Sequence, residues 1–219
     1  MAILGFGART VPSGDPGTSA SAIISEYKQH ASAISLAAGW YSLVLLGRIL
    51  FVAGLRDALR RSGCRTALAD FALVAMAVSV VLEIAAFAIA AGAAHAASTG
   101  SEHSTIVGLD AVANWLDLNI VAPVGASVLA VSLAMLRSRV VPVWLCRLGL
   151  AVGAAGCVAG VINGPGVPAR WSPLPGNQCG YDSGRDCLLV WMLVTGIRLF
   201  RSVGRGAHER APAATDEIG

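Results

Sequence analysis

Charged residues are scarce in this chain of 219 residues: they make up 13% of it, against about 25% in a typical soluble domain. Hydrophobic residues make up 55%. Lysine is almost missing, since Lys28 is the only one among 16 basic residues and the others are arginines. The charges lie mainly outside a few long apolar runs. This composition argues against an ordinary soluble domain and predicts a membrane protein, so the net charge of +3 does not indicate nucleic-acid binding.

Motifs that carry chemistry are also missing. The five cysteines are too scattered for a disulfide framework, and no CxxC or His/Cys cluster has the spacing of a zinc site. No nucleotide-binding loop follows a strand pattern, and no nucleophile–base pair stands in a recognisable context. A signal peptide is not evident, because the apolar stretch Ala2–Ala8 is short, broken by glycine and without basic residues before it. We therefore expect no cofactor and no metal, and we see no persuasive constellation for an enzyme.

The chain does contain long apolar runs. The clearest extends from Ala67 to Ala94 and holds one carboxylate, Glu83, well inside it. A helix needs about 20 apolar residues to cross about 30 Å of hydrocarbon. The sequence therefore predicts an all-α polytopic membrane bundle within residues 32–203. We expect five transmembrane helices, at about 32–55, 67–94, 111–136, 142–162 and 187–203.

The arginines predict the orientation of these helices, because loops on the cytoplasmic side are enriched in Lys and Arg. One side of the predicted bundle holds eleven of them: Arg56, Arg60, Arg61, Arg65, Arg137, Arg139, Arg147, Arg198, Arg201, Arg205 and Arg210. The other side holds four basic residues: Arg9, Lys28, Arg170 and Arg185. We predict that residues 1–31 are extracytoplasmic, with a short surface helix at Ala20–His30. We also predict that residues 204–219 form a disordered cytoplasmic tail, and that the membrane is the cell's inner (plasma) membrane.

Glu83 and Arg48 are charges inside predicted spans. Such residues are costly in hydrocarbon and often serve as proton relays or ion ligands, although a carboxyl can also be held structurally by a neighbouring helix. Counted from inner helix ends near Leu55 and Ala69, the two side chains differ in height by about 11 Å. We therefore expect Arg48 to reach the inner interface, or to pair with Asp70 more easily than with Glu83.

Three polar residues lie at the start of the third predicted span. Asp110, Asn114 and Asp117 are spaced i, i+4 and i+7, which places them on one helix face. Asp117 lies within about one turn of the height of Glu83, so the group could form a polar pocket that opens outward. The alternative is a wet face, with Asp110 solvated and Asp117 among the headgroups. The candidate intramembrane polar site is thus Glu83, Asp117, Asn114 and Arg48.

Cys179 and Cys187 fall in the predicted outer loop, which faces an oxidising compartment. They could form a disulfide, or remain two unpaired thiols. Cys64 falls on the predicted cytoplasmic side.

Glycines mark the fourth predicted span. Gly149 and Gly153 are four residues apart, as are Gly156 and Gly160. Small residues at this spacing let two helix backbones approach closely in lipid. The pattern predicts a helix-packing face but leaves open whether the partner is in the same chain or in another subunit.

The segments VPVWLCRLGLAVG, at 141–153, and LVWMLVTGIRL, at 189–199, resemble the last two helices of an uncharacterised family of bacterial integral membrane proteins common in actinobacteria. Its members pair a P-x-W-L…LG pattern with a W…G-x-x-L ending. The resemblance covers Ile23–Arg201 and implies a multi-pass bundle, usually of six helices, so that either the start is truncated or this branch has lost a span. It implies no catalytic residues. We interpret Trp144, Trp171 and Trp191 as anchors at the membrane interfaces.

Three functional hypotheses follow. The first is an accessory or structural subunit that packs against membrane partners or against itself. The second is a small proton- or ion-coupled transporter or conductance that uses Glu83 and Asp117, although the sequence has no internal repeat and no pair of broken spans. The third, a membrane enzyme, has the least support. All three share the lipid bilayer as a partner, and none involves nucleic acid.

Overall fold

The computed structural model describes residues 19–63, 67–139, 141–162 and 190–198. Every regular element among them is a helix: α2 (Ala20–Arg61), α3 (Ala67–Thr99), α4 (His103–Ser138), α5 (Val143–Ile162) and a shorter helix at 190–198. The first four are long and apolar enough to cross a membrane. The prediction of an all-helical chain with several such helices is confirmed.

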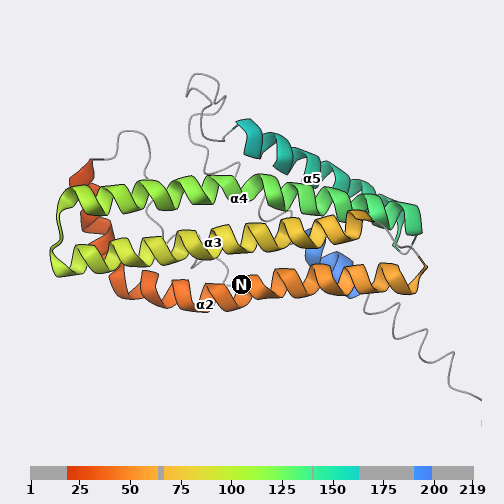
Figure 1. The fold of residues 1–219 in the computed structure, drawn as a ribbon, viewed down its shortest axis with the longest axis horizontal. Coiled ribbons are helices and arrows are strands. Elements are labelled where there is room, and N and C mark those ends of the chain that lie inside the picture. Colours follow the sequence, from red (N-terminus) through yellow and green to blue (C-terminus); the bar gives the residue numbers. More distant parts are fainter. Residues whose placement is uncertain (1–18, 64–66, 140, 163–189, 199–219) are drawn as a thin grey trace, which may run out of the picture.

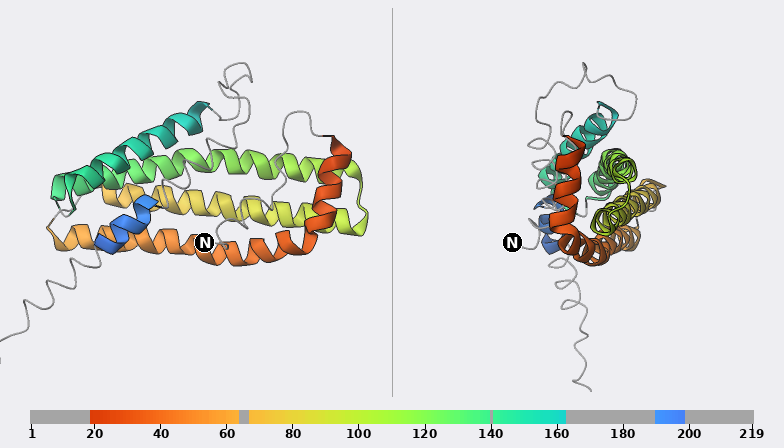
Figure 2. Two further views of the ribbon diagram at one scale, coloured as in Figure 1. Left: turned by 180° about the vertical axis from the view of Figure 1, so that it is seen from behind. Right: turned by 90° about the vertical axis from the view of Figure 1, so that its left-hand side faces the viewer.

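The long helices form an up-and-down bundle (Figure 1). Short connections make chain neighbours antiparallel, and α3 packs between α2 and α4 while α5 packs on the far side of α4. Helix 190–198 lies between α2 and α5 on the reverse of this view (Figure 2). It contacts both of them, since Trp191 touches Phe51 of α2 and Leu145 of α5.

The first long helix begins at Ala20, well before the start near residue 32 that the apolar run suggested. Ser19 caps it, with its hydroxyl accepting a bond from the Ala22 backbone N–H at 3.3 Å. The first turns of α2 run across the ends of α3 and α4 (Figures 1 and 2). Farther along, the Ser35 hydroxyl donates to the Ala31 carbonyl at 2.9 Å, a bond of the kind that bends helices.

These first turns are packed, not merely laid on the surface. Ile23, Tyr27 and Ile34 are buried, and they share a core cluster with alanines of α3 and with Ile106 and Ala113 of α4. The sequence predicted that residues 20–30 lie at the surface. Glu26 and Lys28 are exposed as predicted. The face that carries Ile23 and Tyr27 covers one end of the bundle.

The connection between α3 and α4 is shorter than the predicted loop at 95–110. It consists of residues 100–102, with Gly100 at φ +77° in the left-handed conformation that ends α3. The preceding residues are rich in alanine, the best helix former, so the helix continues past the apolar run. Ala97 and Ile106 of the two extensions are buried at 2% and 1% exposure.

Trp191 anchors the other end of the core. Its side chain is 1% exposed, its indole N–H donates to the Leu145 carbonyl at 3.2 Å, and its ring meets Phe51 edge-on with centroids 6.3 Å apart. The interpretation of Trp191 as an interface anchor is therefore wrong, because the ring fills the groove between α2 and α5 next to the side-chain-free Gly149. Trp144 is exposed, and Trp171 lies outside the described residues.

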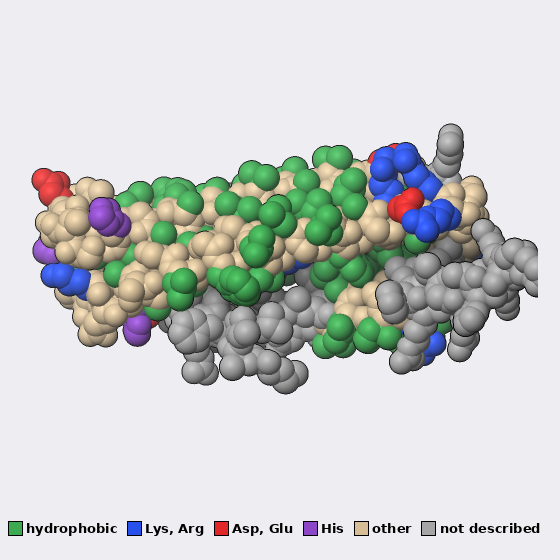
Figure 3. All heavy atoms as spheres, turned by 90° about the horizontal axis from the view of Figure 1, so that it is seen from below, with side chains coloured by type: hydrophobic (Ala, Val, Ile, Leu, Met, Phe, Trp, Pro, Cys, Tyr) green, Lys and Arg blue, Asp and Glu red, His purple; other side chains and the backbone are tan. Residues whose placement is uncertain are grey.

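Large apolar side chains cover the outer surface of the long helices. Along the middle of the bundle the visible face is hydrophobic, and the described charged residues gather at its two ends (Figure 3). On α2 the exposed apolar stretch extends from Leu36 to Leu50, which are 74% and 72% exposed. A contiguous apolar surface along several turns of a helix is costly in water and suits a lipid environment.

Candidate functional site

A buried ion pair joins α2 to α3. The guanidinium of Arg48 donates to the two oxygens of the Glu83 carboxylate, with Nη1–Oε2 at 2.6 Å and Nη2–Oε1 at 3.5 Å. The side chains are only 11% and 5% exposed. A two-pronged pair of this kind is both stronger and more directional than a single bond.

The expectation that Arg48 would reach the inner interface, or pair with Asp70 more easily than with Glu83, is wrong. The arginine-rich end of α2 is Arg61 rather than Leu55, so Arg48 lies about 20 Å from that end, while Glu83 lies about 24 Å from the start of α3. The remaining difference of about 4 Å is easily bridged by two long side chains. Asp70, the partner that seemed easier, pairs with Arg56 instead.

The pair changes what Glu83 can do. An isolated carboxylate in a low-dielectric interior costs several kcal/mol or more, and a guanidinium in contact removes much of that cost. Glu83 is therefore held by a permanent cation from the neighbouring helix. Such an arrangement ties α2 to α3 at a fixed height.

A second polar group lies at the end of the bundle covered by the first turns of α2. The Tyr27 hydroxyl donates to Asp110 Oδ1 at 2.9 Å, and the Asn114 amide donates to Asp110 Oδ2 at 3.1 Å. Asp110 is only 3% exposed. The expectation that it is solvated is wrong, because α2 begins early enough to lay Tyr27 over it.

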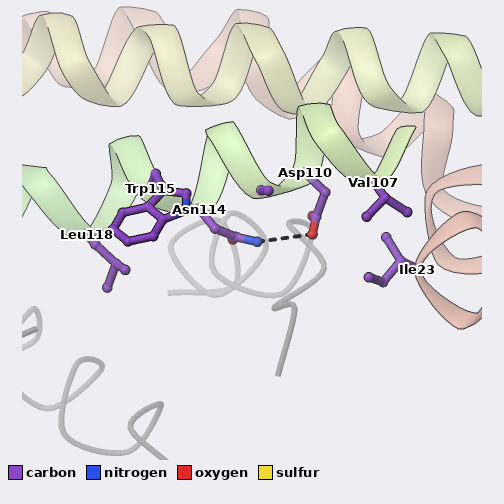
Figure 4. A pocket seen from close by; sticks show the side chains of 7 residues that line it. Ile23, Val107, Asp110, Asn114, Trp115 and Leu118 are labelled. Atoms are coloured by element: carbon purple, nitrogen blue, oxygen red, sulfur yellow. Dashed lines mark hydrogen bonds between the residues drawn. The ribbon is translucent and has the colours of Figure 1, made fainter. Parts of the chain in front are cut away.

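Beside Asp110 lies a pocket of about 260 Å³ (Figure 4). Asp110 and Asn114 form its polar part, and the rest of its lining is Ile23, Val107, Ala111, Trp115 and Leu118. Asp117 is part-buried and does not line it. The structure thus divides the expected polar site into two groups, Arg48 with Glu83 and Asn114 with Asp110.

The glycines of α5 all face α4. A Cβ atom added at Gly153 would lie 2.6 Å from the backbone N of Leu129, and one at Gly160 would lie 2.6 Å from Ala122. At Gly149 it would meet the Ser132 hydroxyl at 2.2 Å, and at Gly156 the Cα of Gly125 at 3.1 Å. The partner of this face is therefore a helix of the same chain.

Gly125 is the matching residue on α4, and the sequence reasoning missed it. A Cβ there would lie 2.6 Å from the backbone N of Cys157. It is a lone glycine shortly after Pro123, without a repeat at four-residue spacing, so the sequence pattern carried little signal. Its small size is what lets the two backbones touch.

The other candidates yield no site. Cys179 and Cys187 lie outside the described residues, as does Cys64, while Cys146 and Cys157 are free thiols within α5. In the part of the chain that is described, no three His, Cys, Asp or Glu side chains are grouped as metal ligands.

Comparison with known proteins does not assign the chain to a family. No protein-family model, no curated protein and no solved structure matches the chain. The resemblance to actinobacterial membrane proteins stays a prediction, and function must be argued from the site itself.

Proposed function

We propose that this chain is an accessory or structural subunit of a bacterial plasma membrane, which packs as a rigid helical bundle against membrane partners. In this proposal five helices cross the bilayer, the N-terminus lies outside, and the arginine-rich end faces the cytoplasm. Arg56, Arg60 and Arg61 end α2 there, and Arg137 and Arg139 end α4. The opposite end of the described helices carries Lys28 alone among Lys and Arg.

The observation that carries the proposal is the bond between Arg48 and Glu83. A proton carrier needs a carboxyl that can lose its charge, and an ion carrier needs one that is open to the ion. Here both carboxylate oxygens accept from a guanidinium, which does not release its proton in proteins. This favours a structural tie between helices.

Close packing of α4 and α5 supports the same conclusion. Gly153 and Gly160 meet the opposing backbone at distances that leave no room for a methyl group. Helices in such contact are poorly suited to rocking or sliding past one another, because interiors are packed as closely as organic crystals.

The positions of the exposed tryptophans agree with a bundle that crosses the membrane. Trp144 lies at the start of α5, near the arginine end, and is 53% exposed. Trp40 and Trp115 lie about 32 Å and about 33 Å from the arginine end, counted from Arg61 and Arg137. Tryptophan favours the two membrane interfaces, and these levels bracket a hydrocarbon layer of about 30 Å.

The alternative, a small proton- or ion-coupled transporter that uses Glu83 and Asp117, is tested by the same substitution. We expect purified Glu83→Gln protein in liposomes to show the same low proton and cation flux as the wild type. We also expect Glu83→Gln to lower recovery of the oligomer or of partners from native membranes, with Glu102→Gln, an exposed acid, as the control. A wild-type flux that Glu83→Gln abolishes while the fold is retained would replace the structural proposal with the transporter.

A further inference from the structure

We propose that the pocket beside Asp110 binds an ammonium group, carried either by a lipid headgroup or by a small soluble amine. This goes beyond the accessory role and does not depend on it. The pocket is about 260 Å³, just below the range of about 300–1,000 Å³ usual for ligand sites, which suits a headgroup-sized cation rather than a large cofactor.

Charge gives the first argument. Asp110 is 3% exposed, and each of its oxygens accepts from a neutral donor, Tyr27 or Asn114. These two bonds fix the Asp110 carboxyl in place, and neither partner brings a positive charge to it. No Lys or Arg among the described residues forms an ion pair with it. A buried carboxylate is costly unless a cation accompanies it, and each oxygen keeps a free lone pair for one.

The pocket wall gives the second argument. Trp115 lines the pocket, and an indole face attracts ammonium groups, quaternary ones included. Ile23, Val107 and Leu118 supply apolar surface around the same space (Figure 4). A carboxylate together with an aromatic ring and aliphatic walls recognises an organic cation better than a hydrated metal ion, which takes several oxygen ligands.

The level in the bilayer gives the third argument. Along α4, Asp110 lies about 40 Å from Arg137, which is the depth of the far headgroups if Arg137 lies among the near ones, since a bilayer is about 40–45 Å thick with both headgroup layers. Leu118 lies about 28 Å from Arg137, within the hydrocarbon. The pocket therefore extends from the depth of headgroups to the depth of acyl chains, and an ammonium can arrive from the lipid or from the water.

The test uses the full-length purified protein. For the lipid arm, it is reconstituted in nanodiscs with equal amounts of phosphatidylethanolamine and phosphatidylglycerol, and bound lipid is counted by native mass spectrometry. For the soluble arm, choline is titrated in detergent and the shift in melting temperature is measured. The variants are Asp110→Asn and Trp115→Leu. Their matched controls are Glu102→Gln, an exposed acid at the same end of α4, and Trp144→Leu, an exposed indole far from the pocket.

We expect wild-type protein to retain phosphatidylethanolamine over phosphatidylglycerol, or to be stabilised by choline. The first result identifies a lipid ligand and the second a soluble one. Either preference should fall at least about tenfold in Asp110→Asn, since hydrogen bonds to charged groups are among the stronger ones, and severalfold in Trp115→Leu. The controls should match the wild type.

Two results would overturn the proposal. One is a wild-type protein that shows neither lipid preference nor a choline shift. The other is a preference that survives in Trp115→Leu, whose exposed position makes it safe for folding if Asp110→Asn proves unstable.

Discussion

Breaking the Arg48–Glu83 pair should destabilise the bundle strongly from either side, whereas removing both charges should not. Glu83→Gln leaves a guanidinium buried without its counter-ion. The penalty for leaving a buried charge unpaired is about 3–5 kcal/mol, and the part-buried position of Arg48 places the expected loss toward the lower end of that range. Arg48→Met should cost somewhat less, because a carboxyl can take up a proton whereas a guanidinium cannot release one. The double variant should lie within about 1 kcal/mol of the wild type.

The wild type, the two single variants and the double variant form a double-mutant cycle. Each protein is unfolded in mixed micelles with rising SDS, and unfolding is monitored by circular dichroism or tryptophan fluorescence. The expected coupling between the two substitutions is about 3 kcal/mol or more, obtained from the cycle rather than from any single variant. The exposed pair of Arg61 and Asp57, four residues apart on α2, is the control and should show little coupling. Additive effects of Arg48→Met and Glu83→Gln would refute the pairing and with it the structural proposal.

Three further predictions follow from packing and hydrogen bonds. Gly153→Ala should destabilise the bundle by about 2 kcal/mol or more, because the added methyl group would clash with the α4 backbone. Its control is Gly92→Ala, where no atom lies within 4 Å, and this variant should be neutral or stabilise α3 by about 0.5–1 kcal/mol. The SDS concentration at the midpoint of unfolding measures both effects. Trp191→Phe should cost about 2–4 kcal/mol, because it removes part of a buried ring and the bond to a backbone carbonyl, and a loss below about 0.5 kcal/mol would contradict the burial. Tyr27→Phe should cost about 1–3 kcal/mol and increase hydrogen exchange in the first turns of α2, while exchange at the arginine end stays unchanged.

Apolar runs were sufficient to predict the helices but not where they end. Hydropathy marks what lies in lipid, whereas helix ends depend on capping and on packing outside it, as Ser19 and Gly100 show. The error had consequences, since a height counted from Leu55 instead of Arg61 favoured Asp70 over Glu83 as the partner of Arg48. A miscount of six residues shifts a side chain by about 9 Å along a helix.

Tertiary contacts explain the other differences. The repeat of glycines on α5 predicted close contact, yet nothing in it pointed to Gly125 on α4 as the partner. Trp191 has the sequence context of an interface anchor, and only the groove between α2 and α5 makes it a core residue. Asp110 looked solvated because the segment that covers it is remote in sequence and polar on its other face.

The most direct test of the account is the accessibility of two exposed serines at opposite ends of the bundle. Ser62 follows α2 at the arginine end, and Ser101 lies in the short connection between α3 and α4. In a background without native cysteines, a membrane-impermeant maleimide should label Ser101→Cys in intact cells and Ser62→Cys only after the membrane is permeabilised. Labelling of Ser62→Cys from outside, or of both positions equally, would contradict the placement of the bundle across the membrane.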